Sequence, residues 1–286
     1  MAGMNNTIRD LVHIGTSSFS SKDWIGAFYP DGTKPAEFLN IYSKTFDSVE
    51  IDSTYYSIPS IKTVEGWVTR IPEDFKICAK FPRSIVHGGK ESQPDAKRIL
   101  NRETTYRDRD RFLEAIAGLK KQAGPLLIQF PYFSKNVFAF RDVFFEILDK
   151  FLEDLPDDFR YAVEIRNRTW LKPAFAELCR RHGAALVLTD QAWMPHDDEI
   201  EKMFDPVTAD FSYVRLLGDR KAIEAITKTW GEEVVDNSDR LKRWAAVLQR
   251  LADRAIESYI FANNHYSGHA PATARRLRDM VFDNVD

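Results

Sequence analysis

Two patterns of hydrophobic and polar positions alternate along this chain. Short apolar runs rich in β-branched and aromatic residues, as expected of buried strands, cover residues 11–17, 47–53, 75–81, 125–131, 160–166, 184–190, 211–218 and 257–264. Between them lie amphipathic stretches with apolar residues three and four positions apart, for example residues 35–46, 109–122, 137–155, 172–183 and 239–256. Eight strands alternating with helices predict an α/β fold with parallel strands, a TIM-type (β/α)8 barrel.

The organisation along the chain predicts one domain over residues 1–286, with a core over about 11–282 and a disordered or extended lead over 1–10. No internal repeat, low-complexity tract or linker interrupts the pattern. An open doubly wound sheet is the weaker alternative, because no G-x-G-x-x-G turn follows a strand. Residues 87–104 and 190–210 are long for connections of this kind and are expected to form lids, and residues 219–233 are expected to be partly helical.

Composition narrows the class of protein. With 44% hydrophobic and 13% aromatic residues the chain can bury a large core, and its net charge of -3 argues against a general nucleic-acid coat or a polybasic membrane binder. Cys78 and Cys179 are expected to be reduced thiols. The first ten residues lack an apolar signal core, and no run approaches the ~18 apolar residues of a membrane span. A cytoplasmic protein with no membrane partner is expected, and the sequence does not indicate its oligomeric state.

Polar residues gather at the carboxyl end of nearly every predicted strand. Alternation of side chains along a strand puts one column inward. This column contains Glu50, Lys80, Gln129, Glu164, Arg166, Asp190, Arg215 and Asn263 or Asn264. Any single Glu–Arg or Lys–Glu pair among them is equally consistent with scaffolding. The whole set would impose a desolvation cost on a chain selected for stability alone, so it predicts a polar site at the C-terminal mouth of the barrel.

The charges at these strand ends predict an anionic ligand. Together with Arg83, His87 and Arg220, which follow closely in loops, the basic residues at the strand ends outnumber the carboxylates, which is typical of phosphate or carboxylate binding. After the last strand, Gly268 and Pro271 mark a tight turn and a helix start, a position where barrels often bind phosphate. The aromatic residues that follow strands either stack a sugar or a base, or pack under the loops.

Two roles stay open for the carboxylates. Glu50 and Glu164 are candidates for an acid–base pair across the barrel, and they are equally suited to orienting Lys80 and the arginines. A metal site is disfavoured, because His265 and His269 stand in the turn-like sequence "HYSGH" and not on a clear helix. The sequence therefore predicts no metal and no cofactor.

Seven motifs, in order, resemble the YecE-like family, domain of unknown function 72. They include "VEIDSTYYSIPS", "FKICAKFPRSIVHG", "VEIRNRTW" and "YIFANNHYSGHAPATA", and the resemblance runs from about residue 12 to about residue 280. It implies a TIM-barrel fold and a cytoplasmic protein, but no reaction. Two positions depart from the family pattern: Leu217 stands where a histidine is usual, and an asparagine is usual near Thr273.

Together these features predict an enzyme that acts on a small anionic substrate, phosphorylated or sugar-like, by general acid–base chemistry. They do not distinguish a hydrolase from a lyase or an isomerase. The predicted catalytic residues are Glu50, Lys80, Glu164 and Asp190, and the predicted substrate-binding residues are Tyr55, His87, Gln129, Arg166, Trp170, Arg215, Asn263, Asn264, His265 and Gly268. Two alternatives are a barrel that binds or processes nucleic acid, and a metabolite-binding protein without catalysis.

Overall fold

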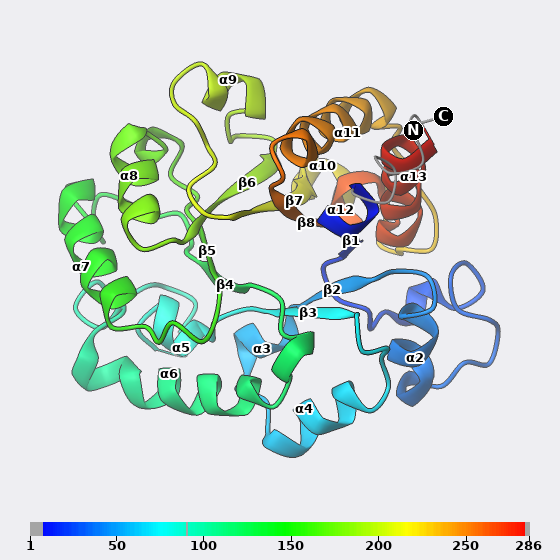
Figure 1. Cartoon of the computed structure of the whole chain (residues 1–286), viewed down its shortest axis with the longest axis horizontal. Helices are drawn as coiled ribbons and strands as arrows, with labels where there is room; N and C mark the ends of the chain where they lie inside the picture. Colours follow the sequence, from blue (N-terminus) through cyan, green and yellow to red (C-terminus); the bar gives the residue numbers. More distant parts are fainter. Residues whose placement is uncertain (1–7, 90, 284–286) are drawn as a thin grey trace. The chain divides into compact units, whose positions relative to one another are not determined.

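The computed structural model describes residues 8–89 and 91–283 (Figure 1). These residues divide into two compact units. Unit 1 comprises residues 8–50, 188–197 and 210–283, and unit 2 comprises residues 51–89, 91–187 and 198–209. Of the predicted lead, residues 8–10 are helical and the rest lies outside the described residues. The single-domain organisation stays a prediction.

Each apolar run predicted from the sequence contains a strand. The strands are β1 Val12–Thr16, β2 Ser48–Ile51, β3 Lys76–Ala79, β4 Leu126–Gln129, β5 Tyr161–Glu164, β6 Ala185–Gln191, β7 Phe211–Gly218 and β8 Glu257–Ala262. Most strands are shorter than the runs. The predicted site residues within strands are Glu50, Gln129, Glu164, Asp190 and Arg215, whereas Lys80, Arg166 and Asn263 lie just after strand ends.

The long amphipathic stretches are helical, and shorter helices follow several strands. The helices are α2 Phe38–Tyr42, α3 Ser53–Tyr56, α4 Ile61–Val68, α5 Arg83–Val86, α6 Arg102–Ala117, α7 Arg141–Glu153, α8 Pro173–Arg181, α9 Asp197–Glu201, α10 Arg220–Ile226, α11 Ser238–Asp253, α12 Asn264–Ser267 and α13 Ala270–Phe282. The sequence pattern did not predict α3, α5 and α12, because a single helical turn is too short to show a period of 3.6 residues.

In unit 1 the first strand pairs with the last. β1 and β8 are parallel, with Ile14 opposite Ile260, and β7 lies on the other side of β8, with Val214 also opposite Ile260. A bridge between Ser17 and Glu50 brings β2 beside β1. Pairing of the first strand with the eighth is required in a (β/α)8 barrel and absent from an open doubly wound sheet. The chain therefore has the parallel α/β fold of TIM type that the sequence predicts.

In unit 2 the strands β3, β4 and β5 lie side by side. Gln129 of β4 is opposite Glu164 of β5, and a bridge from Lys80 to Leu127 brings the end of β3 beside β4. Because parallel strands end at the same edge of a sheet, this register brings Lys80, Gln129 and Glu164 to one edge.

Candidate functional site

The polar edge of unit 2 is held in place by Thr54, in the short helix α3. Its hydroxyl accepts a hydrogen bond from the Lys80 backbone N–H at 3.0 Å and lies 2.9 Å from the Ile51 carbonyl, to which it can donate. These bonds tie the start of α3 to the ends of β2 and β3. As a result, Tyr55 and Lys80 are fixed next to each other, with the Lys80 Nζ 5.0 Å from the centre of the Tyr55 ring.

Tyr55 and His87 form a hydrogen-bonded pair at this edge. The Tyr55 hydroxyl lies 2.7 Å from His87 Nε2, and the two rings meet nearly at right angles, with centres 5.9 Å apart. His87 is buried and Tyr55 is half-buried. The helix α5 is one turn long and ends at Val86, and His87 is the residue that caps its C-terminus. We call these two residues the Tyr–His pair.

Three cations surround the Tyr–His pair, and two of them have a carboxylate partner. Lys80 Nζ lies 3.0 Å from Asp52 Oδ1, and Arg166 Nε donates to Glu164 Oε1 at 2.9 Å. Arg83 forms no side-chain hydrogen bond or ion pair with any residue that the structure describes. The group therefore has one positive charge more than its carboxylates balance, and that charge is at Arg83.

Burial and these cations set the protonation of the Tyr–His pair. Burial, followed by the positive charge of Arg83 and a smaller effect of Arg166, lowers the pKa of His87 to about 4, against an opposing hydrogen bond with the Ser92 backbone. Burial also raises the pKa of Tyr55 to about 12, although the same two arginines oppose that increase. At neutral pH the imidazole is therefore uncharged and the phenol keeps its proton. Both groups respond to charge at Arg83 and Arg166.

Two further residues after β5 have packing and positioning roles. Trp170, a predicted ligand-binding residue, is buried among phenylalanines, with its ring centre 5.5 Å from that of Phe144 and 5.8 Å from that of Phe133. Asn167 was not among the predicted site residues. Its side-chain oxygen accepts from the Phe133 N–H at 2.8 Å and its amide donates to the Phe133 carbonyl at 2.9 Å. This double contact fixes the segment after Arg166. The feature of the sequence that could have identified Asn167 is an asparagine that follows shortly after the end of a strand.

In unit 1, Glu50 and Arg215 form a closed ion pair. Arg215 donates from Nε to Glu50 Oε2 at 2.8 Å and from Nη2 to Oε1 at 2.7 Å, and the Tyr213 hydroxyl donates to Oε2 at 2.8 Å. Glu50 is 0% exposed and Arg215 is 2% exposed. A carboxylate whose two oxygens are both occupied by donors is poorly placed to exchange a proton, so this geometry favours a structural role for Glu50.

Asp190, predicted to be catalytic, is saturated in the same way. Its Oδ2 accepts from Trp244 Nε1 and from the Tyr266 hydroxyl, both at 2.8 Å, and its Oδ1 accepts from Arg240. The carboxylate is buried. These contacts tie the end of β6 to α11 and α12, which is a stabilising arrangement within unit 1.

The segment after β8 is also engaged within unit 1. The Asn263 side-chain oxygen lies 2.7 Å from His265 Nδ1, and the Asn264 side-chain oxygen accepts from Trp24 Nε1 at 3.2 Å and from the Ala270 N–H at 3.0 Å. Gly268 has a φ of 110°, and a Cβ there would lie 2.5 Å from the Glu232 carbonyl. Since the first N–H of α13 is used and Pro271 has none, this helix start is less suited to an anion than the sequence suggested.

The candidate residues are thus described in two groups. Unit 2 contains Tyr55, Lys80, His87, Gln129, Glu164, Arg166 and Trp170, and unit 1 contains Glu50, Asp190, Arg215, Asn263, Asn264, His265 and Gly268. The pairing of Glu50 with Glu164 as acid and base stays a prediction. Among the described residues, no group of three His, Cys, Asp or Glu side chains is placed to hold a metal ion. Leu217, at the position of the family's usual histidine, is buried in β7.

The parallel strands, the β1–β8 pairing and the charged strand ends define an α/β protein of the TIM type with a polar site. Residues 13–285 match the family described as "Protein of unknown function DUF72", and the chain belongs to that family. The family expected from the motifs is thereby confirmed.

Named relatives extend over nearly the whole chain. The UPF0759 protein YecE of Escherichia coli K12 is 27% identical and aligns over 93% of this chain and 91% of its own, and the UPF0759 protein YunF of Bacillus subtilis is 22% identical over 95% of each. A crystal structure of a DUF72 family protein from Thermotoga maritima is 28% identical, with a TM-score of 0.71 over 95% of this chain and 99% of that one. These names state no reaction, so a function has to be argued from the site.

No helix in the described part of the chain has both the length and the apolar character needed to cross a membrane.

Proposed function

We propose that the chain is an enzyme that binds a small anionic substrate beside Arg83 and Arg166 and moves a proton through the Tyr–His pair. The observation that carries the proposal is the 2.7 Å contact of Tyr55 with His87, next to an arginine that has no carboxylate partner in the described part of the chain. A substrate anion would supply the missing negative charge at Arg83. Lys80 and Arg166, each oriented by its own carboxylate, would complete the clamp.

Substrate binding and proton transfer are coupled in this arrangement. In the free protein the two arginines help to keep His87 uncharged and weakly basic. An anion between them would offset their charge and raise the pKa of His87 toward neutrality, where an imidazole exchanges protons most effectively. When the Tyr55 hydroxyl accepts a proton from the substrate, it passes its own proton to His87, and when it donates a proton to the substrate, a protonated His87 replaces that proton.

Glu164 acts through Arg166 in this scheme. It is fully buried and holds the Arg166 Nε at 2.9 Å, which suits a positioning residue better than a general base. The sequence left two roles open for Glu164, acid–base catalysis and orientation of an arginine. We propose the second role.

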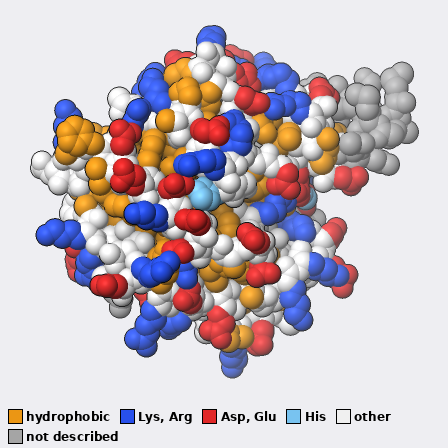
Figure 2. Space-filling model, turned by 60° about the vertical axis from the view of Figure 1, so that its left-hand side comes forward, with side chains coloured by type: hydrophobic (Ala, Val, Ile, Leu, Met, Phe, Trp, Pro, Cys, Tyr) orange, Lys and Arg blue, Asp and Glu red, His pale blue; other side chains and the backbone are white. Residues whose placement is uncertain are grey.

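Binding of a nucleic acid at this site is less well supported. Lys80 and His87 are buried, whereas a site that grips a polymer backbone presents its cations on the surface. Figure 2 shows acidic and basic side chains interspersed over the face in view, with hydrophobic side chains between them. Such a mixed surface offers little steering for a polyanion.

The proposal is tested first by NMR titration of His87 in the full chain. The imidazole is expected to titrate near pH 4 without ligand. Saturating inorganic phosphate is expected to raise this midpoint by about one unit or more, because an anion close to an arginine and a histidine interacts with both. Arg83→Gln should raise the midpoint without ligand and remove most of the response to phosphate. A midpoint that phosphate does not move would refute an anion site at this pair.

Catalysis is tested by a turnover screen over phosphorylated and carboxylated metabolites. Tyr55→Phe removes one oxygen and keeps the ring, so turnover should fall by about 100-fold or more while the melting temperature stays within a few degrees. Unchanged turnover in Tyr55→Phe would refute the proton-transfer role. Phosphate binding at Arg83 with no turnover of any tested compound would favour the non-catalytic alternative.

A further inference from the structure

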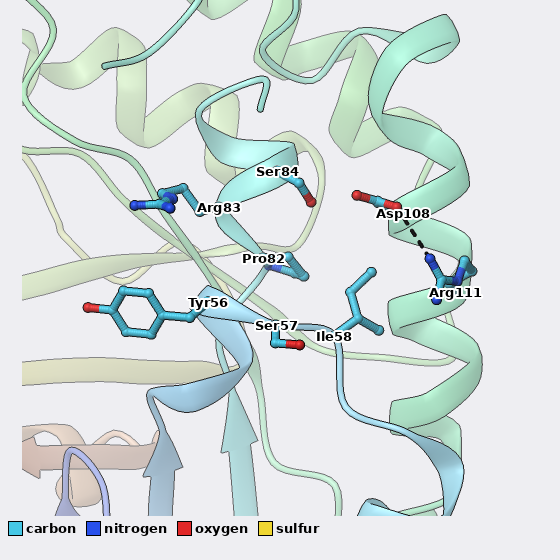
Figure 3. Close-up of a pocket in the computed structure, with 8 residues that line it drawn as sticks. All are labelled: Tyr56, Ser57, Ile58, Pro82, Arg83, Ser84, Asp108 and Arg111. Atoms are coloured by element: carbon cyan, nitrogen blue, oxygen red, sulfur yellow. Dashed lines mark ion pairs between the residues drawn. The ribbon is translucent and has the colours of Figure 1, made fainter. Parts of the chain in front are cut away.

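A cavity of about 280 Å³ opens beside the Tyr–His pair within unit 2 (Figure 3). Arg83 lines it, and Tyr56 contributes the neighbouring wall. The Tyr56 ring meets that of Tyr55 edge-on, with centres 5.2 Å apart. The cavity therefore shares Arg83 with the proposed site and adjoins it through the contact of Tyr56 with Tyr55. Its volume is near the lower end of the ~300–1,000 Å³ of small-molecule sites, which suits a metabolite-sized ligand.

The far side of this cavity carries both hydrogen-bond donors and acceptors. Asp108 and Arg111 extend from α6 and lie 3.8 Å apart at their charged atoms, which is long for an ion pair and leaves both able to bind other groups. Ser57 and Ser84 add hydroxyl groups, and Figure 3 shows Ser84 pointing toward Asp108. The Arg83 side chain and the Tyr56 ring extend away from Asp108 and Arg111 in Figure 3.

The polar groups that line this cavity favour some classes of ligand over others. An apolar body would displace water from the carboxylate and from both serine hydroxyls without replacing the hydrogen bonds of that water, which is costly. A second anionic group would meet Asp108. A body with several hydroxyl groups satisfies the lining, because each hydroxyl both donates to the carboxylate and accepts from the guanidinium. The Tyr56 side chain, 75% exposed, offers an aromatic face against which the C–H face of a sugar ring can pack.

We infer that the cavity between Tyr56, Arg83 and Asp108 is the subsite for the hydroxylated body of a sugar phosphate or polyol phosphate, with the phosphate group at Arg83. This inference rests on the proposed function, since it takes Arg83 as the seat of the substrate's anion. It adds the class of substrate, and it assigns Asp108, Arg111 and Ser84 to substrate specificity.

The test is isothermal titration calorimetry of the full chain with glucose-6-phosphate, glycerol-3-phosphate, inorganic phosphate and unphosphorylated glucose. At least one of the two phosphorylated polyols should bind about tenfold tighter than inorganic phosphate, and glucose should bind weakest. Asp108→Asn keeps the shape of the side chain but removes its charge, and it should reduce the affinity for that compound by about tenfold without changing the affinity for inorganic phosphate. Ser84→Ala should act in the same direction. Asp110→Asn, an equivalent change on α6 outside the cavity, is the matched control and should have no effect.

The outcomes separate this inference from the proposed function. The subsite would be overturned if the phosphorylated polyols and inorganic phosphate bound with equal affinity and if Asp108→Asn and Ser84→Ala left these affinities unchanged. The proposed anion site would still be supported in that case if phosphate raised the pKa of His87 and Arg83→Gln removed this response. Absence of binding by every phosphate compound, together with an unresponsive His87, would overturn both. Circular dichroism and thermal melting of each variant show whether a loss of affinity comes from unfolding. If one of Asp108→Asn and Ser84→Ala does not fold, the affinity of the other variant decides whether the subsite exists.

Discussion

His13 of β1 is clamped between two carboxylates, and raising the pH is expected to remove much of the stability that this clamp contributes. Its Nδ1 lies 3.2 Å from Asp47 Oδ2 and its Nε2 lies 2.9 Å from Glu257 Oε1. The ring stacks on Tyr259, with centres 4.7 Å apart. His13, Asp47 and Glu257 lie at the amino-terminal ends of β1, β2 and β8, where barrel residues serve stability more often than catalysis. The expected readout is therefore the free energy of unfolding.

The size and sign of the effect follow from the pKa of His13. Burial lowers this pKa, but the hydrogen bonds and charges of Asp47 and Glu257 outweigh burial and raise it from 6.5 to about 9. The His13 side chain is 12% exposed, and solvent screens its contact with Glu257, which is 25% exposed, less than its contact with Asp47, which is 46% exposed. One pKa unit corresponds to about 1.4 kcal/mol, and a difference of about 2.5 therefore corresponds to about 3 kcal/mol. Because the folded pKa is the higher one, this stabilisation is complete below about pH 6.5 and is lost as the pH rises through about 9.

The assay is urea unfolding of the parent chain and of His13→Gln at pH 6 and at pH 9.5, with the midpoint of the His13 imidazole followed by NMR. Subtracting the variant from the parent removes the titration of all other groups. We expect a gap in unfolding free energy of about 3 kcal/mol at pH 6 and of less than about 1 kcal/mol at pH 9.5. The reasoning is refuted by a gap that is equal at the two pH values, or by an imidazole midpoint near 6.5.

Three other changes test the contacts of unit 1, each by urea or thermal unfolding. Arg215→Met leaves the Glu50 carboxylate buried without its cationic partner and should lower the free energy of unfolding by about 3–5 kcal/mol. Adding Glu50→Gln to the same chain should recover part of that loss. A loss below about 1 kcal/mol in Arg215→Met would argue against a closed ion pair. Asp190→Asn should cost about 2–3 kcal/mol, since it weakens the bonds from Arg240, Trp244 and Tyr266, and a neutral effect would reopen a catalytic role. Gly218→Ala should cost about 2 kcal/mol or more, because φ is 67° and the new Cβ would lie 2.4 Å from the His265 carbonyl; stability equal to the parent would show that the backbone relaxes there.

The periodicity of the sequence was sufficient to predict the strands and the long helices. A run such as residues 211–218 has one way to bury its apolar side chains in a parallel sheet, and the observed β7 covers the same residues. The short helices could not be predicted in this way. The helix α3 depends on the Thr54 hydroxyl, which binds backbone groups of two strand ends that are far apart in the sequence.

The candidate site was predicted less completely than the fold. Alternation along strands identified which residues stand at the carboxyl ends, including Lys80, Glu164 and Arg166. It could not rank them, because the chemistry of a carboxylate depends on how many donors its oxygens already have. Glu50 and Glu164 look equivalent in the sequence, yet the first is closed by Arg215 and Tyr213 and the second holds the partly exposed Arg166.

The sequence by itself determined the class of the protein, its family, the order of its strands and helices, and the set of polar residues at the strand ends. These features follow from local periodicity and from neighbours along the chain. The tertiary structure alone decided which side chains touch, and hence that Arg83 has no carboxylate partner within residues 8–89 and 91–283 while Tyr55 and His87 share a hydrogen bond. The physical reason is that pKa values and ion pairing depend on separations of a few ångströms between residues from different strands and loops, and no pattern along one segment records those separations.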